Sequence, residues 1–212
     1  MKHFLKFVQI LKGAFLYKKL RKEQEVKYLI VGLGNIGAEY ESTRHNIGFQ
    51  VLDFMAKQKA LNFEQKRLAY IAESKFKGRK LIYCKPTTYM NLSGKAVNYW
   101  LQKEKIPISN LLIIVDDLAL PFGAIRMKKK GGDAGHNGLI DIAQTLGHQN
   151  FNRMRLGIGD EFSKGHQVDY VLGKWAGIEK DKLPERLEKM SEAIKSFISI
   201  GIDRTMNIYN GQ

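Results

Sequence analysis

The residues best suited to proton transfer lie in one polar loop between Gly32 and Phe49. This loop carries an Asn, a Tyr, an Arg and a His in the sequence GLGNIGAEYESTRHNIGF. It follows a short apolar run that predicts a buried strand, and loops that leave a sheet strand are where α/β proteins place their chemistry. Histidine titrates close to physiological pH, so His45 is the natural candidate for a general base.

A second candidate lies at the tip of the aliphatic run from Leu111 to Val115, which is typical of a central strand buried on both faces. The acids Asp116 and Asp117 follow it directly. Desolvated carboxylates usually have an assigned partner. Asp117 suits a turn before Pro121, so Asp116 is the better functional candidate.

A Gly-rich turn from Gly131 to Gly138 leads into a helical pattern that starts near Leu139. Glycine-rich turns beside a helix N-terminus can bind anions. The preceding run from Arg126 to Lys130 is basic. Such a run is usually a solvated face, but its place beside this turn favours phosphate binding.

Gly32, Gly34 and Gly37 also match the G-x-G-x-x-G fingerprint of dinucleotide-binding folds. That fingerprint needs a helix that starts at the third glycine, whereas about eight polar residues follow Gly37 before a helical period begins. Asp53 has a suitable spacing for the ribose-binding acid but lies inside a helical pattern. We interpret the glycines as providing a tight turn and close backbone approach, with dinucleotide binding as the minority alternative.

Composition indicates one basic globular domain. The chain has 212 residues and a formal net charge of +14, and residues 1–22 hold seven Lys or Arg and no Asp or Glu. The charge favours a polyanionic partner, above all nucleic acid. The single Cys84 excludes an internal disulfide. No apolar run is long enough to cross a membrane, so we expect a cytoplasmic protein.

We divide the chain into a basic amphipathic extension over residues 1–25 and an α/β domain over residues 26–212. Phe4, Val8 and Leu11 of the extension recur at helical spacing among lysines. Three alternatives remain open for it: packing on the domain, lying on a membrane or RNA surface, or extending loosely.

Strand and helix patterns alternate irregularly, with a hairpin among the crossovers. They predict a single three-layer α/β domain with a mixed, mostly parallel twisted sheet flanked by helices. The expected strands are 27–32, 69–76, 79–84, 111–115, 126–130 and 154–158; the expected helices are 46–60, one that Ser93 caps, one from 139, and 183–197.

Four motifs in order resemble those of bacterial peptidyl-tRNA hydrolases: GLGNIGAEYESTRHNIGF, PTTYMNLSGKAV, DDLALPFG, and GGDAGHNGL followed by FNRMRLGIG. The resemblance covers about residues 27–210. It implies a monomeric enzyme that cleaves the ester between a peptide and the terminal ribose of tRNA, so the partner is peptidyl-tRNA. Neither a metal nor an organic cofactor is expected.

The resemblance assigns roles residue by residue. His45 matches the catalytic histidine and Asp116 the carboxylate that orients it, as in hydrolytic triads. A lone histidine is more often structural, but its position between Arg and Asn in this motif reverses that expectation. Asn35, Asn91 and Asn137 match three active-site asparagines; we expect Asn91 to position the reacting carbonyl or its water, and the other two to hold substrate.

Tyr40 and Met90 match positions that line the cleft around the terminal adenosine and the peptide. Lys128 and Arg155 match residues that contact the 5′-phosphate of tRNA, and Arg126 matches a basic neighbour.

The chain departs from the family pattern at four positions. Ile36 stands where proline is usual, and Ala119 replaces a commonly acidic residue. Lys130 and Ala134 replace glycines of the anion-binding turn.

Two rival functions remain. One is a non-catalytic RNA-binding relative, against which the retention of His45, Asp116 and the three asparagines argues. The other is a nucleotide-cofactor enzyme based on the glycine fingerprint. Metal-dependent hydrolysis is the weakest alternative, because the five histidines show no ligand spacing and no H-E-x-x-H is present.

Overall fold

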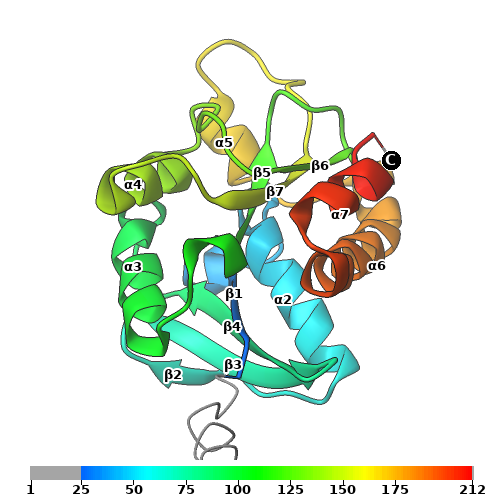
Figure 1. Cartoon of the computed structure of the whole chain (residues 1–212). Coiled ribbons are helices and arrows are strands. Elements are labelled where there is room, and N and C mark those ends of the chain that lie inside the picture. The colour runs from blue at the N-terminus through cyan, green and yellow to red at the C-terminus, as the bar shows by residue number, and fades with distance from the viewer. Residues whose placement is uncertain (1–24, 212) are drawn as a thin grey trace, which may run out of the picture.

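Strand β1 (Lys27–Gly32) lies at the centre of a seven-stranded sheet with the order β2-β3-β4-β1-β5-β7-β6 (Figure 1). The computed structural model describes residues 25–211. The predicted amphipathic extension over residues 1–25 therefore lies outside the described residues, apart from Glu25. None of the helices in the described part of the chain is both long enough and apolar enough to span a membrane.

The sheet is mixed and mostly parallel, as predicted. Strands β4, β1, β5 and β7 run parallel, and β2, β3 and β6 pair antiparallel at the two edges. The remaining strands are β2 (Glu64–Lys66), β3 (Ala69–Phe76), β4 (Arg79–Pro86), β5 (Leu111–Asp117), β6 (Ile125–Lys128) and β7 (Asn152–Gly157).

Helices cover both faces of the sheet. One face carries α3 (Ser93–Glu104) and α4 (Asn137–Leu146); the other carries α2 (Ile47–Gln58), α6 (Gly177–Ile200) and α7 (Ile202–Tyr209) (Figure 1). The short elements are α5 (Gln167–Val171) and the 3-10 turns η1 (Ala38–Tyr40), η2 (Arg44–Asn46), η3 (Met90–Leu92) and η4 (Ile108–Asn110).

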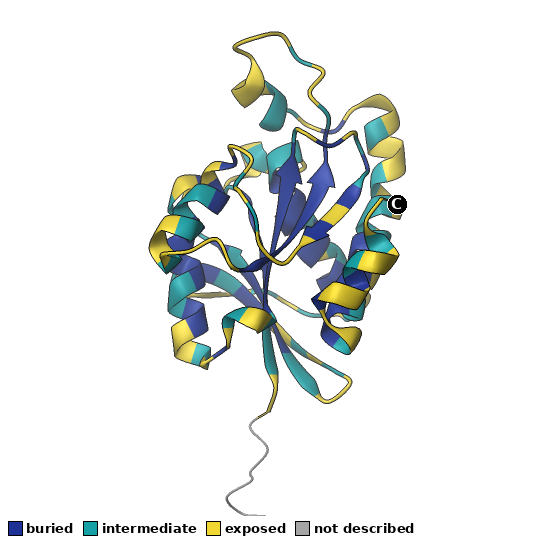
Figure 2. Ribbon diagram, turned by 45° about the horizontal axis from the view of Figure 1, so that its top comes forward, coloured by how far each residue is buried: buried dark blue, intermediate teal, exposed yellow. Residues whose placement is uncertain are grey.

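The central strands are buried on both faces because their side chains alternate between two cores. On β5, Leu112 and Ile114 pack with α2 and α6, while Ile113 and Val115 pack with α3 and α4. Figure 2 shows these strands buried and the outward faces of the helices exposed. The packing of the aliphatic run on both faces therefore fixes the place of the two acids at its end.

The predicted hairpin between β3 and β4 is confirmed. Lys77 and Gly78 form its two-residue turn with φ of 48° and 74°. Positive φ at both positions is the signature of a type I′ turn, which suits the right-handed twist of the strands.

The glycine motif joins the end of β1 to the start of α2. A Cβ on Gly32 would lie 2.1 Å from the carbonyl oxygen of Gly48, so the two backbones touch. Helix α2 begins at Ile47, after η1 and η2, and not at Gly37. The prediction of close backbone approach is thus confirmed, and the described residues do not form the geometry of a dinucleotide fingerprint.

Two local predictions are wrong. Ser93 does not cap α3: it is the first helical residue, is buried, and donates its hydroxyl to the carbonyl of Met90 at 2.8 Å. The basic strand runs from Ile125 to Lys128, so Lys129 and Lys130 follow it in the turn.

Candidate active site

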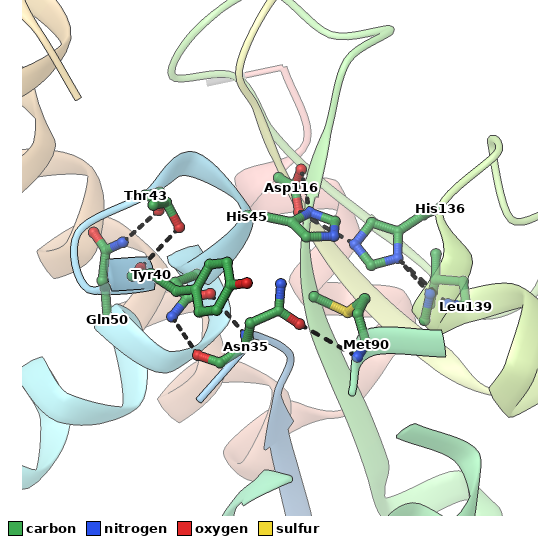
Figure 3. Close-up of polar contacts among 11 residues, drawn as sticks. Asn35, Tyr40, Thr43, His45, Gln50, Met90, Asp116, His136 and Leu139 are labelled. Atoms are coloured by element: carbon green, nitrogen blue, oxygen red, sulfur yellow. Dashed lines mark hydrogen bonds and ion pairs between the residues drawn. The ribbon is translucent and has the colours of Figure 1, made fainter. Parts of the chain in front are cut away.

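His45 and Asp116 meet at the edge of the sheet where the parallel strands β1 and β5 end. Nδ1 of His45 lies 3.0 Å from Oδ1 and 3.1 Å from Oδ2 of Asp116 (Figure 3). The side chain of His45 is 13% exposed and that of Asp116 only 3%. The structure thus brings these two predicted residues together, with the histidine on the more open side.

The segment before His45 is held by its own hydrogen bonds. Thr43 is fully buried and donates its hydroxyl to the carbonyl of Tyr40 at 2.8 Å. Gln50 reaches back from α2 and donates to the carbonyl of Thr43 at 2.7 Å. These contacts, drawn in Figure 3, fix the turn that presents His45.

His136, to which the sequence analysis gave no role, is the third member of the cluster. Its Nδ1 accepts the backbone N–H groups of Gly138 and Leu139, at 3.1 and 3.4 Å, and so caps α4. An unprotonated Nδ1 leaves the proton of the neutral ring on Nε2. Nε2 therefore donates to Oδ1 of Asp116 at 3.2 Å.

The charge of Asp116 controls the protonation of the cluster. Burial alone would lower the pKa of His45, but the charge of Asp116 and its hydrogen bond raise that pKa above its ordinary value. Burial opposes ionisation of Asp116, yet its two imidazole partners hold its pKa well below the usual range. Asp116 is therefore a carboxylate at neutral pH.

His45, Asp116 and His136 also form a possible metal-binding group, since one donor atom from each lies within 4.8 Å of the others. A metal on Nε2 of His136 would need the proton on Nδ1. That nitrogen already accepts two backbone N–H groups. The proton arrangement favours a hydrogen-bonded cluster here, and the expectation of a metal-free reaction stays a prediction.

Asn35 is anchored beside this cluster. Its backbone N–H donates to Oδ1 of Asn46 at 2.8 Å, and its carbonyl accepts from Nδ2 of Asn46 at 2.9 Å. Its side-chain oxygen accepts the N–H of Met90 at 3.3 Å. The amide group of Asn35 is thereby oriented, and its nitrogen remains available to a ligand.

The other predicted residues differ in the hollow that they line and in their exposure. Asn137 lines the same hollow as His45 and Asp116, together with Val168 and Val171 of α5. Asn35 lines a second hollow beyond Asn46. Met90 is buried, Tyr40 is half-buried on η1, and Asn91 is exposed on η3. Of the three asparagines, only Asn137 thus lines the hollow that contains the histidine pair.

The sequence model of the family described as Peptidyl-tRNA hydrolase matches residues 29–212. The chain belongs to the peptidyl-tRNA hydrolase family. It is 57% identical to the peptidyl-tRNA hydrolase of Cytophaga hutchinsonii over 185 residues, which are 87% of this chain and 98% of that protein. It is also 57% identical to the peptidyl-tRNA hydrolase of Bacteroides fragilis, covering 87% of this chain and 99% of the relative.

The fold agrees with a solved member of the family. A crystal structure of peptidyl-tRNA hydrolase from Acinetobacter baumannii matches with a TM-score of 0.81 at 33% identity, covering 87% of this chain and 94% of that one. The predicted peptidyl-tRNA hydrolase family, the predicted enzyme class and the predicted fold class are all confirmed.

The predicted phosphate-binding residues of this hydrolase differ in their surroundings. Arg126 and Lys128 are exposed on the edge strand β6. Arg155 is paired in register with Arg126 but is buried, and its Nη1 lies 2.5 Å from Oδ2 of Asp117. The carboxylate of Asp117 therefore balances the charge of Arg155. A contact of Arg155 with a phosphate stays a prediction.

Two of the departures from the family pattern have local structural effects. Ala134 adopts φ of 52°, a left-handed conformation that costs a residue with a Cβ roughly 1 kcal/mol. Ala119 donates its N–H to Oδ1 of Asp117 at 2.9 Å, so the turn after β5 is maintained without an acidic side chain there.

Proposed function

We propose that the chain hydrolyses the ester bond between a peptide, or an N-blocked amino acid, and the terminal ribose of tRNA. The reaction recycles tRNA from stalled or abortive translation. One observation carries the proposal: Nδ1 of His45 contacts the buried carboxylate of Asp116, which leaves Nε2 of His45 as a base. The family membership supplies the substrate class.

His45 activates a water molecule in this mechanism. Nε2 takes a proton from the water as the water oxygen attacks the ester carbon. Asp116 stabilises the imidazolium that forms, and the raised pKa of His45 agrees with that role. Collapse of the tetrahedral intermediate breaks the bond to the ribose oxygen, which then takes the proton from His45.

The three asparagines position the substrate without adding charge. An amide offers both a donor and an acceptor. We assign Asn91 to the reacting carbonyl or its water, and Asn35 and Asn137 to the substrate backbone and ribose. The contact between the Asn35 oxygen and the N–H of Met90 supports a fixed amide orientation. Tyr40 and Met90 line the cleft around the terminal adenosine and the peptide.

Lys128 is the principal contact for the 5′-phosphate of tRNA, with Arg126 as its basic neighbour. Both side chains are exposed on β6, next to the Gly-rich turn. Arg155 contributes less direct affinity, because Asp117 already engages its Nη1.

Release of peptide from an N-blocked aminoacyl-tRNA tests the proposal. The wild type is compared with His45→Ala, in the presence of a metal chelator. His148→Ala is the matched control, because His148 is exposed and accepts the N–H of Asn150. We expect His45→Ala to lose about a thousandfold in rate, and the wild type and the control to stay active.

The other outcomes identify the alternatives. A folded wild type that binds tRNA without cleaving it would indicate the non-catalytic RNA-binding relative. Activity that survives in His45→Ala would place the base elsewhere.

We also propose that residues 26–212 form the catalytic domain, and that the enzyme acts as a monomer in the cytoplasm. Size-exclusion chromatography with light scattering tests the monomer: a mass of one chain is expected, and a dimer mass would contradict it.

A further inference from the structure

Arg44, the residue before His45, uses all three nitrogens of its guanidinium group in hydrogen bonds to two other elements, α5 and α6. Its Nε and Nη2 donate to the two carboxylate oxygens of Glu179 at 3.1 and 2.6 Å. Its Nη1 donates to the carbonyl of Tyr170 at 3.2 Å, and its guanidinium lies 4.4 Å from the centre of the Tyr170 ring. The side chains of Arg44 and Glu179 are only 12% and 14% exposed, so this ion pair is poorly screened.

The backbone on both sides of Arg44 is joined to the same region. The N–H of Arg44 donates to the carbonyl of Gly173 at 3.0 Å, and Thr43 forms an antiparallel bridge with Lys174. Gly173 also leaves room for the side chain: a Cβ there would lie 2.9 Å from Nη1 of Arg44. The segment that presents His45 is therefore attached directly to the segment that follows α5.

Helix α5 forms one wall of the hollow beside His45. Gln167, Val168 and Val171 line that hollow together with His45 and Asp116. Yet α5 has five residues, and none of them is buried. So short a helix is not stable by itself. Its position depends on contacts with its neighbours at its C-terminal end. Tyr170 and Val171 pack against the core, and the Tyr170 hydroxyl donates to the carbonyl of Ile158 at 2.6 Å. Arg44 adds the contact with the Tyr170 carbonyl and ring on the side of His45.

Glu179 completes the connection from the first turn of α6. Its Oε2 accepts the N–H of Ala176 at 3.3 Å as well as the Arg44 contact, so the acceptor is itself fixed. An arginine fork fits two carboxylate oxygens and a carbonyl at once, whereas a lysine ammonium cannot reproduce that geometry.

We propose that Arg44 is a positioning residue: it holds the α5 wall of the substrate hollow at a fixed distance from His45. This inference rests on the proposed function. Arg44 acts on substrate binding and not on proton transfer, because the imidazole of His45 is held by Asp116, which His136 contacts in turn. Its loss should affect every ester that enters the hollow, whether or not the ester carries a whole tRNA.

The test compares Arg44→Met with Arg44→Lys on two substrates, N-blocked aminoacyl-tRNA and a minimal N-blocked aminoacyl-adenosine. For Arg44→Met, we expect KM to rise roughly tenfold or more on both substrates, with a much smaller change in kcat. The pH midpoint of kcat/KM should stay at the wild-type value. For Arg44→Lys, KM should rise less than it does for Arg44→Met.

Lys27→Met is the matched control. Lys27 also forms an ion pair, 2.8 Å to Glu104, but it lies at the start of β1 and lines no part of the hollow. Hydrogen exchange gives a readout that is independent of activity. The amide of Leu172, which bonds to Val168 in α5, should exchange faster in Arg44→Met and not in Lys27→Met.

Three results would overturn this inference and leave the proposed function standing. They are an unchanged KM in an active Arg44→Met enzyme, a rise in KM no larger than that of Lys27→Met, and unchanged hydrogen exchange in α5. A wild type that cleaves neither substrate would instead remove the proposed function, and with it the kinetic role of Arg44.

Discussion

His45 and His136 contact the same oxygen of one carboxylate, Oδ1 of Asp116, at 3.0 and 3.2 Å. Their ring centres are 4.9 Å apart. Since the backbone of α4 fixes the tautomer of His136, Asp116 receives a second hydrogen bond that does not depend on the state of His45. The carboxylate therefore stays ionised and oriented while His45 gains and loses a proton.

The protonation of His45 should make kcat/KM depend on pH. Protonated His45 cannot accept a proton, so kcat/KM should be low at acid pH and rise to a plateau. Because the pKa of His45 is raised, the midpoint of this rise should lie above the ordinary value of 6.5. In Asp116→Asn the charge is lost while burial remains, so the midpoint should move to lower pH. The plateau should also fall by about a hundredfold or more. Equal midpoints in the two proteins would contradict this account of the pKa.

The two contacts of His136 can be separated by substitution. His136→Asn keeps an oxygen that can cap α4 but is too short to reach Asp116 in the same way. It should retain most of the thermal stability and lose several-fold in kcat. His136→Ala loses the cap as well, and should cost about 1 kcal/mol more in the free energy of unfolding. Thermal melts and kcat on the same samples check both effects; equal stability of the two variants would exclude the capping role.

Lys128→Ala should weaken binding of tRNA substrates and barely affect a minimal ester. Loss of one phosphate contact should reduce the slope of log KM against log salt by about 0.7 to 0.9. Lys75→Ala is the control, because Lys75 is an exposed lysine on β3, far along the strand order from β6. An equal loss on both substrates would remove the phosphate assignment.

Arg155→Ala should act mainly on stability. It leaves Asp117, whose side chain is 2% exposed, without its ion-pair partner, which typically costs roughly 3 to 5 kcal/mol. The double variant Arg155→Met with Asp117→Asn should recover part of that loss, because neither charge is then buried alone. Urea denaturation measures both. A stable Arg155→Ala that has lost only tRNA affinity would instead support a direct phosphate contact.

The local pattern of the sequence was sufficient to predict the central strands and the β3–β4 hairpin. It marked His45 and Asp116 as separate candidates, and their contact was expected only from the resemblance to the family. It could not predict α5, because a helix of five residues is too short to show an apolar period, although Tyr170 and Val171 pack against the core. The sequence predicted no role for Arg44, and it predicted a phosphate contact for Arg155 without its ion pair. The partners of these two arginines, Glu179 and Asp117, are set by tertiary contacts.

His136 illustrates the same limit at the site. Its place beside Asn137 in the Gly-rich turn was a visible signal, but its contact with Asp116 depends on how α4 docks against β5. Which ring nitrogen carries the proton follows only from the backbone N–H groups at the start of that helix.

The pairing of β1 with β5 makes catalysis a reporter of folding. Gly32 is in register with Ile114, two residues before Asp116, and a slip of one residue would turn Asp116 to the opposite face of the sheet. Parallel strands that are distant in sequence pair slowly. The rate at which peptide release recovers after dilution from urea would therefore report how fast β1 and β5 pair. Molecules with a shifted register would be inactive even when they are compact.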